Sequence, residues 1–174
     1  MKLEELAQFP KENIMKLFEV LARDQKTIDG FWFLAVEEAY GLERAVEFDT
    51  AVWSKVGRIN AQRLQNIFDL KEKGISAFLE VFRFDPLSIF FDYELEVIST
   101  NSVVMRFTNC PAQKGRLKMG KGVFPCRNFE EGYFNGFAKA IDPRIQVRCG
   151  FSPPEKYSDN LWCEWHFSID EQNE

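Results

Sequence analysis

The segment FFDYELEVISTNSVVMRFTNC, residues 90–110, decides the fold, because its hydrophobic pattern has a period of two residues. In its first half, apolar residues at odd positions from Phe91 to Val97 alternate with acidic residues, as in a strand with one buried face. The residues STNS (99–102) are typical of a turn, and Val103, Met105 and Phe107 then restore the alternation. The pattern predicts a β-hairpin.

The residues before this hairpin have the 3.6-residue periodicity of amphipathic helices. We predict helices over residues 10–23 and 25–40, the second ending at Gly41 and central in the fold because its first half is apolar nearly all round. After the segment LERAVEF, Asp49 can cap a helix over residues 50–71, and a shorter helix over 75–82 ends before Pro86. The predicted inward face of the third helix consists of Val52, Trp53, Val56, Ile59, Leu64 and Ile67.

After the hairpin the pattern alternates again between helix and strand. A short helix is expected after Pro111 and another over residues 129–141, which Pro143 ends. The segments 144–149 and 161–169 read as two more strands joined by the loop 150–160. This order predicts an α+β fold with N-terminal helices packed on a mostly antiparallel sheet of about four strands. The length suits a single domain over 1–174, with a helical part (1–85) and a hairpin–helix–hairpin part (86–174).

Aromatic residues are the unusual feature of the composition, with 18 phenylalanines in 174 residues. Large side chains leave irregular spaces between them, so a pocket for a small hydrophobic or aromatic molecule between helices and sheet is expected. An ordinary aromatic core is the alternative explanation. The candidate ligand contacts are Trp32, Glu37, Trp53, Asn60, Gln113 and Arg116.

Charge and hydropathy narrow the range of partners. A net charge of −5 argues against a nucleic-acid-binding surface, which needs clustered Lys and Arg. The longest apolar stretch, FWFLAV, is too short to cross a bilayer, and acidic residues stand where a signal peptide needs an apolar run. These features predict a cytoplasmic protein without membrane contacts, whose four cysteines are thiols. A homodimer remains an open alternative to a monomer.

Strand alternation separates the only histidine from the nearby cysteines. In LWCEWHFSI, Cys163 and His166 point to opposite faces, with His166 near Glu164, while Cys149 and Cys163 both belong to apolar faces. Buried free thiols explain this pair. A structural zinc site is the alternative, which would make the chain a zinc-stabilised structural or interaction module, although the spacing lacks a C-x2-C motif. Its ligands would be Cys110, Cys126, Cys149 and Cys163.

Two residues are candidates for catalysis, and whether the protein is an enzyme stays open. Cys110 precedes Pro111 at a predicted helix start, where the helix dipole and Arg116 would lower its thiol pKa. Glu37, held among aromatic residues, would have a raised pKa and could act as an acid or base, unless it marks the polar side of its helix. Either would support a cysteine- or carboxylate-dependent, hydrolase-like enzyme. Phosphate-binding glycine loops and dinucleotide fingerprints are absent from the sequence.

Two segments resemble known proteins. GFWFLAVEEAYGLERAVEFDTAVWSKVGRINAQRL and the stretch from CPAQKGRLKMGKGVFPC to LWCEWHF resemble an uncharacterised prokaryotic family described only as cytosolic protein. More distantly, EEGYFNGFAKAI, IQVRCGF and LWCEWHF are similar to the end of 4-vinyl-reductase-type ligand-binding domains and of aminothiazoline carboxylic acid hydrolase-like proteins. This resemblance implies an α+β domain that holds a small, often hydrophobic molecule. The cytosolic family tends to have C-x-x-C-P-P where this chain has CGFSPP, so Ser152 replaces a cysteine and weakens a metal site built on that pair.

Overall fold

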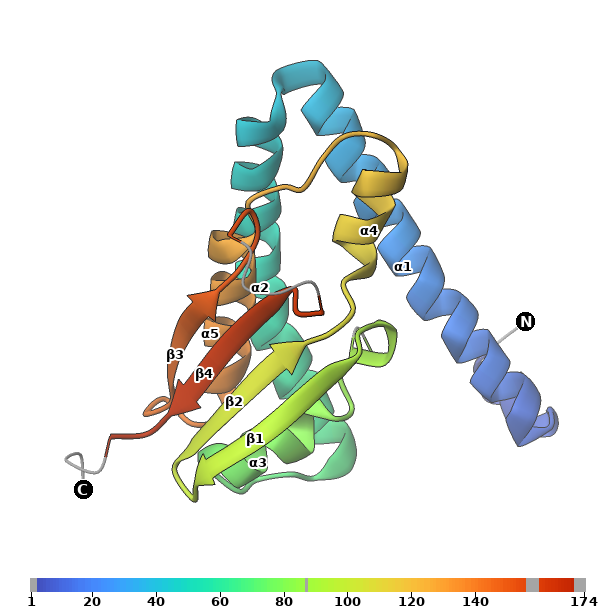
Figure 1. Cartoon of the computed structure of the whole chain (residues 1–174). Helices are drawn as coiled ribbons and strands as arrows, with labels where there is room; N and C mark the ends of the chain where they lie inside the picture. The colour runs from blue at the N-terminus through green and yellow to red at the C-terminus, as the bar shows by residue number, and fades with distance from the viewer. Residues whose placement is uncertain (1–2, 87, 156–159, 171–174) are drawn as a thin grey trace.

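The computed structural model describes residues 3–86, 88–155 and 160–170 (Figure 1). Within these residues, five α-helices and a four-stranded antiparallel sheet form an α+β fold, which confirms the predicted class. The helices are α1 (Lys11–Tyr40), α2 (Leu42–Phe68), α3 (Gly74–Phe82), α4 (Pro111–Lys118) and α5 (Arg127–Ile141). The strands are β1 (Tyr93–Ser99), β2 (Ser102–Phe107), β3 (Gln146–Phe151) and β4 (Cys163–Ser168), and two short 3-10 helices are η1 (Leu3–Gln8) and η2 (Ser88–Phe90).

The sheet has the strand order β1-β2-β4-β3, with every neighbouring pair antiparallel. The predicted hairpin is β1 and β2, in which Tyr93 pairs with Phe107. Met105 of β2 and Cys149 of β3 both pair with Trp165 of β4, so the apolar positions of three strands share one face. In the loop predicted between β3 and β4, residues 156–159 lie outside the described part of the chain.

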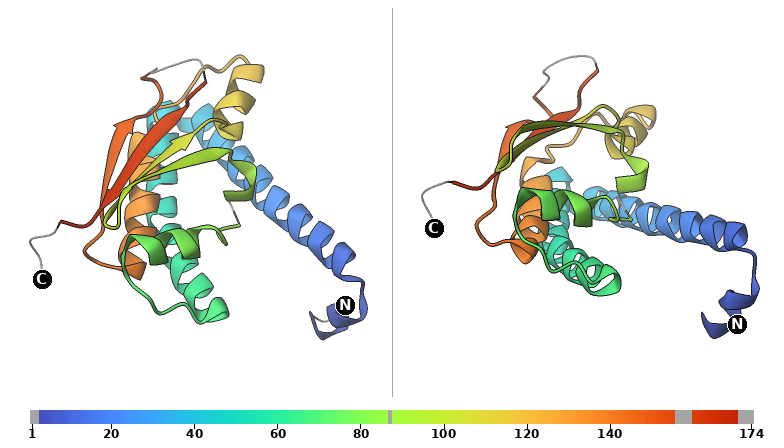
Figure 2. Two further views of the ribbon diagram at one scale, coloured as in Figure 1. Left: turned by 60° about the horizontal axis from the view of Figure 1, so that its bottom comes forward. Right: turned by 90° about the horizontal axis from the view of Figure 1, so that it is seen from below.

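Helices cover that apolar face of the sheet, and α2, α3 and α5 all lie on the same side (Figure 2). The ring of Phe78 in α3 stacks on Phe167 with 4.5 Å between centroids, and Phe134 in α5 lies 5.3 Å from Trp165. Phe167 and Trp165 are fully buried. The core is therefore the aromatic layer between α3, α5 and the sheet, and it accounts for many of the phenylalanines.

Helices α2 and α5 pack closely because glycines lie at their contact. A Cβ atom at Gly57 of α2 would lie 2.2 Å from the carbonyl oxygen of Tyr133 in α5. One at Gly136 of α5 would lie 2.7 Å from the carbonyl oxygen of Ser54 in α2. Carbon and oxygen atoms do not approach this closely, so only glycine permits the observed spacing.

The N-terminal helices differ from the prediction in their boundaries. The two helices predicted before Gly41 form one continuous helix, α1, because no proline lies between residues 11 and 40 to interrupt it, and Asp24 lies inside the helix. Gly41 has a φ of 87°, which a glycine adopts readily, and it ends α1 as predicted. Helix α2 begins at Leu42, so LERAVEF is helical and Asp49 lies inside the helix rather than capping it.

Helix α1 is not central in the fold, contrary to the prediction. It meets α2 at Gly41, and its N-terminal half extends away from the rest of the molecule (Figure 1). Phe31 and Trp32 are each 69% exposed, because no other described element covers this part of the helix. The exposed apolar side chains of α1 are Met15, Phe18, Val20, Leu21, Ile28, Phe31, Trp32 and Tyr40. None of the described helices is long and apolar enough to span a membrane.

The predicted inward face of α2 is only partly correct. Trp53 and Leu64 are buried and Val56 packs against the core, whereas Val52, Ile59 and Ile67 are exposed. The tight contact with α5 is made by small residues, so the buried face of α2 follows Ala45, Gly57 and Ala61 as well as the large side chains. Of the exposed residues, Val52 faces the open space between α1 and α2, whereas Ile59 and Ile67 lie on the surface of α2.

Candidate ligand-binding cleft

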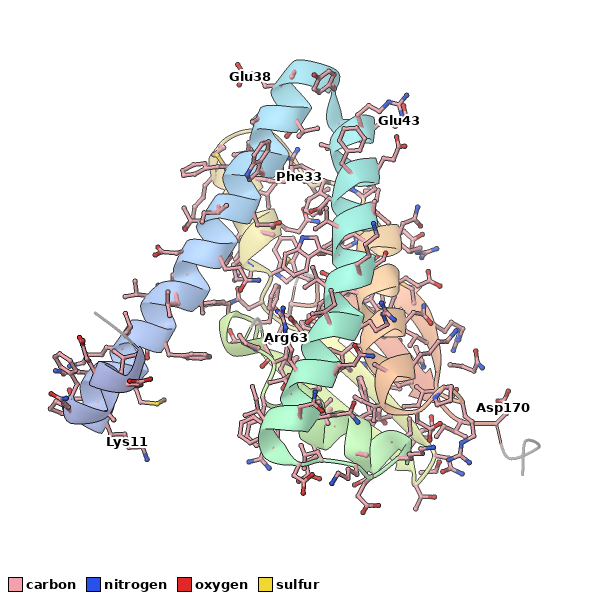
Figure 3. All side chains as sticks on the ribbon, turned by 180° about the vertical axis from the view of Figure 1, so that it is seen from behind. Lys11, Phe33, Glu38, Glu43, Arg63 and Asp170 are labelled. Atoms are coloured by element: carbon pink, nitrogen blue, oxygen red, sulfur yellow. The ribbon has the colours of Figure 1, made fainter. Side chains whose placement is uncertain are left out.

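The divergence of α1 and α2 leaves an apolar cleft between them. Figure 3 shows the two helices joined near Glu38 and Glu43 and separating below, with the side chain of Phe33 on α1 near α2. The space has a volume of about 540 Å³. This cleft, called the helix cleft below, is lined by Gln25, Ile28, Asp29, Trp32, Phe33 and Val36 of α1 and by Ala45, Phe48, Asp49, Val52, Trp53 and Val56 of α2.

A smaller space of about 90 Å³ lies next to the helix cleft, toward the sheet. Asp29, Asp49 and Trp53 line both spaces and mark the boundary between them. We call this second space the inner chamber. Its walls are Lys26, Asp29, Asp49, Trp53, Phe90, Phe91, Cys110, Ala112, Gln113, Phe124, Cys126, Phe129 and Glu130. Two further voids of about 50 and 10 Å³ adjoin it, and Glu130 lines both of them as well.

Trp53 fixes the boundary between the helix cleft and the inner chamber. Its indole Nε1–H donates a hydrogen bond to Oδ1 of Asp29 on α1 at 2.9 Å. The indole also makes edge contacts with Phe129 and Tyr133 of α5, each with 5.8 Å between ring centroids. Because these contacts hold the ring from two neighbouring helices, α1 and α5, the entrance to the inner chamber has a defined shape.

Three carboxyl groups line the inner chamber, and burial raises the pKa of each. The pKa of Asp49 rises to about 7, through burial and then through the nearby Asp29. The pKa of Glu130 rises to about 8, through burial and then through Asp49 and Asp85. For Asp29 burial outweighs the hydrogen bond from Trp53, so its pKa is also raised. An apolar environment disfavours the charged form of a carboxyl group, and Asp49 and Glu130 are therefore poised to take up or release protons near neutral pH.

Arg116 and Glu37 form a buried ion pair that joins α4 to α1. Arg116 Nη1 lies 2.6 Å from Oε2 of Glu37 and Nη2 lies 3.0 Å from Oε1. The rings of Phe33 and Phe124 lie 5.5 and 5.6 Å from the guanidinium carbon. The arginine hydrogen bonds lower the pKa of Glu37, so the predicted raised pKa is wrong. Glu37 is a fixed carboxylate here, and Arg116 is neutralised by it.

Gln113 also has a structural role. Its Nε2 donates to the backbone carbonyl of Phe124 at 2.9 Å, and its Oε1 accepts from the backbone N–H of Phe124 at 3.1 Å. These two bonds hold the segment that connects α4 to α5 against the inner chamber. The side chain reaches the chamber wall, and each polar end of its amide makes a hydrogen bond to the backbone of Phe124.

The four thiols are buried or half-buried, and none of them is activated as a nucleophile. Burial raises the pKa of Cys110 to about 11, contrary to the predicted lowering, because loss of hydration outweighs the hydrogen bonds at the start of α4. Burial also raises the thiol pKa of Cys126, Cys149 and Cys163. At neutral pH all four are therefore thiols, which are poor nucleophiles and poor metal ligands.

Three of the four cysteines line one small void. Cys110, Cys126 and Cys163 surround the space of about 10 Å³, together with Glu130, and Cys149 is not among its lining residues. In the part of the chain that the structure describes, no group of three or more His, Cys, Asp and Glu residues is arranged to hold a metal ion. The four-cysteine zinc site stays a prediction.

The histidine and the strand cysteines lie where the alternation predicted. His166 Nε2 lies 2.9 Å from Oε1 of Glu164 on the outer face of the sheet. Arg106 joins this group, with its Nε 2.6 Å from Oε2 of Glu164. Cys163 is buried on the opposite face, and Cys149 packs against the same core.

The remaining predicted contacts divide between two places. Trp32 lines the helix cleft at its exposed edge and Trp53 lies at the inner boundary, so the structure brings these two residues to one space, and their contact with a ligand stays a prediction. Asn60 is half-buried and lies close enough to the Tyr133 hydroxyl to lower its pKa, but it lines neither the helix cleft nor the inner chamber.

Sequence reasoning missed the carboxyl groups of the inner chamber. The available signal was an acidic residue inside an aromatic run: Asp29 in TIDGFWF, Asp49 in EFDTAVW and Glu130 in NFEEGYF. The predicted cap at Asp49 requires a helix to begin just after this residue, whereas α2 begins at Leu42. Lys26, which lines the same chamber with its Nζ 5.2 Å from the centroid of Phe90, was also missed.

Comparison with known proteins supplies a family but no activity. Among solved structures, the chain is similar to a trafficking protein particle complex subunit 3 from Naegleria fowleri covalently bound to palmitic acid, with a TM-score of 0.48 and 15% sequence identity. That similarity covers 90% of this chain and 97% of the other, and it is too distant to assign a ligand. A search of the curated proteins found no match. Residues 7–169 match a family of unknown function, DUF6125, and the chain therefore belongs to that family.

Proposed function

We propose that this protein binds a small hydrophobic or aromatic molecule in the helix cleft. The observation that supports this most directly is the cleft itself: about 540 Å³ between α1 and α2, with walls that are apolar except at Gln25, Asp29 and Asp49. Ligand pockets commonly have volumes of roughly 300–1,000 Å³ and apolar or aromatic walls with a few polar groups. The helix cleft has this character, and the inner chamber provides its polar end.

The aromatic residues of the helix cleft favour a flat or chain-like apolar ligand. Trp32 and Phe48 line its exposed edges, Phe33 lies on the wall, and Trp53 closes its inner end. A bound molecule would remove the exposed parts of these rings from water, which stabilises the complex by about 25 cal/mol for each Å² of apolar surface buried. Binding therefore depends chiefly on apolar area.

A displacement assay with two matched variants tests this proposal. The neutral fluorophore N-phenyl-1-naphthylamine should bind with enhanced emission, and Val52→Trp should weaken that binding at least about fivefold by filling the helix cleft. Val20→Trp is the control, because Val20 is similarly exposed on α1 but does not line the cleft. Equal affinities of the two variants and the wild type would contradict the proposal.

Native mass spectrometry of the purified protein adds an independent measurement. Retention of an organic molecule by the wild type, and its loss in Val52→Trp, is the expected result. A bound metal ion without an organic molecule would instead favour the zinc-stabilised structural module. A bare protein mass, combined with no fluorophore binding, would count against both.

A further inference from the structure

The inner chamber combines a hydrophobic wall with an excess of acidic groups. Asp29, Asp49 and Glu130 come from three different helices, and Lys26 is the one basic residue among the lining residues. Four phenylalanines and Trp53 complete the wall. Carboxyl groups beside aromatic faces are the surroundings in which proteins bind organic cations, because the rings and the carboxylates both attract positive charge.

Glu130 is the strongest indication that this space is a binding site. Its carboxyl group makes neither a hydrogen bond nor an ion pair with a described side chain, although the residue is largely removed from water. Glu130 lines the inner chamber and both of the adjoining voids. Burying a carboxyl group without a partner costs several kcal/mol if it is ionised.

The neighbours of Glu130 do not neutralise it. The nearby carboxyl groups of Asp49 and Asp85 repel a negative charge on Glu130. The nearby thiols of Cys126 and Cys163 carry no positive charge. The hydroxyl of Tyr133, one turn further along α5, is already donated to Oδ2 of Asp85 at 2.7 Å.

Lys26 does not neutralise the chamber either. It lies over the ring of Phe90 and forms no ion pair with a carboxylate among the described residues. Burial lowers its pKa, with only Cys110 acting in the opposite direction among its charged neighbours. A positive charge placed between Asp29, Asp49 and Glu130 would therefore meet mainly acidic groups.

We propose that the inner chamber binds the protonated amine of an amphiphilic ligand whose apolar part lies in the helix cleft. This inference rests on the proposed function, since the cleft has to hold the rest of the molecule. The chamber volume of about 90 Å³ fits a small polar head group. An anionic head group, such as a fatty-acid carboxylate, would meet the carboxyl groups and is disfavoured.

Three ligands with the same eight-carbon chain separate the contributions of head group and chain. Octylamine, 1-octanol and octanoate are titrated against the protein with bound N-phenyl-1-naphthylamine at pH 8. Octylamine should displace the fluorophore at an about tenfold lower concentration than 1-octanol, since a hydrogen bond to a charged group adds about 1.5–3 kcal/mol. Octanoate should be the weakest of the three.

Two conservative variants test whether the chamber carboxylates cause this preference. Glu130→Gln and Asp49→Asn should bring the displacement by octylamine to within about threefold of that by 1-octanol. Comparing octylamine with 1-octanol within each variant separates a lost head-group preference from a damaged helix cleft, because damage to the cleft would weaken displacement by both ligands. Glu131→Gln is the matched control on α5, because Glu131 lines neither the inner chamber nor the helix cleft.

The pH dependence provides a second readout. The preference for octylamine should decrease between pH 8 and pH 6, because protonation of Glu130 and Asp49 removes the negative charge that attracts the amine. Displacement by 1-octanol should be unaffected over this range.

The outcomes distinguish this inference from the proposed function. Equal displacement by octylamine and 1-octanol, or stronger displacement by octanoate, overturns the amine site while the helix cleft remains a ligand site. Suppression of the octylamine preference by millimolar Ca²⁺ or Mg²⁺ would make the chamber a metal site and overturn the proposal. Failure of the fluorophore to bind the wild type would refute both.

Discussion

Replacing Glu130 by glutamine should change how the stability of the ligand-free protein depends on pH. Glutamine has the shape of a protonated glutamic acid but cannot ionise, so it removes only the charged form. The pKa of Glu130 is about 8 in the folded protein against an ordinary value of 4.5, because burial disfavours the carboxylate. The wild type therefore binds one more proton when folded than when unfolded between these two pH values.

This proton uptake determines the sign and the size of the change in unfolding free energy with pH. The stability contributed by protonated Glu130 is fully present below pH 4.5 and is lost as the pH rises toward 8, at about 1.4 kcal/mol per pH unit. Over this interval of roughly 3.5 units the loss is at most about 5 kcal/mol. Asp49, with a pKa of about 7, adds to the same trend in the wild type, and the two groups are coupled because each disfavours ionisation of the other.

Urea denaturation at pH 5, 7 and 9 measures this effect. Glu130→Gln should have the stability of the wild type at pH 5 and should exceed it by about 2–5 kcal/mol at pH 9, with the same dependence of unfolding free energy on urea. Glu131→Gln, one residue further along α5, should keep the pH dependence of the wild type. Parallel stability curves for Glu130→Gln and the wild type would refute the burial of an unpaired carboxyl group.

Three further predictions concern packing, the buried ion pair and association. Gly57→Ala should lower the unfolding free energy by about 1–3 kcal/mol, because its Cβ would lie 2.2 Å from a backbone oxygen of α5. Gly30→Ala should raise the unfolding free energy by about 0.5–1 kcal/mol, since nothing lies within 4 Å of the added Cβ. Urea denaturation should show these two changes in unfolding free energy with opposite signs. Arg116→Lys should lower the unfolding free energy by about 1–3 kcal/mol at pH 7, because the two hydrogen bonds from the guanidinium to Glu37 are lost. Since the ion pair lowers the pKa of Glu37, the difference in unfolding free energy between wild type and variant should shrink as the pH falls below the ordinary pKa of glutamate. The chain exposes 11185 Å², whereas a compact monomer of this mass exposes about 8,800 Å², and the difference is larger than the roughly 800 Å² that each partner buries in a stable dimer. We therefore expect a homodimer that forms through the apolar face of α1. Light scattering should show that Leu21→Lys converts this dimer to a monomer, and a monomeric wild type would refute the expectation.

The β-sheet could be predicted from the sequence because its signal is local. The alternation of apolar and polar residues predicted that β1 and β2 form a hairpin and that Cys163 and His166 point to opposite faces of the sheet, and both predictions are confirmed. A strand period of two leaves little freedom once one face is apolar. The same logic placed Cys149 on the core side of β3.

The helical part was harder because helix periodicity does not say which partner covers an apolar face. The aromatic run around Phe31 and Trp32 reads as a buried helix, yet both side chains are exposed. The closest contact of α2 is made at Gly57, which carries no hydrophobic signal. Val52 and Ile59 fit the predicted stripe, but both side chains are exposed, and Val52 lines the helix cleft.

The inner chamber could not be predicted, because its walls come from segments far apart in the chain. Asp29, Asp49 and Glu130 are separated by 20 and 81 residues, and nothing in their local patterns indicates that they meet. The pKa of Cys110 was predicted in the wrong direction for the same reason: the helix start is visible in the sequence, but the burial that outweighs it is not.

Acidic groups that lie away from water have different partners in different parts of the molecule. Where α1 meets α4, the carboxylate of Glu37 receives two hydrogen bonds from Arg116, and its pKa falls. At the start of β3, Asp142 is likewise held by the guanidinium of Arg144. Among the described residues, Glu130 at the inner chamber has no arginine or lysine partner, and its pKa rises. We infer that the protonated amine proposed above would supply this missing cation from outside the chain.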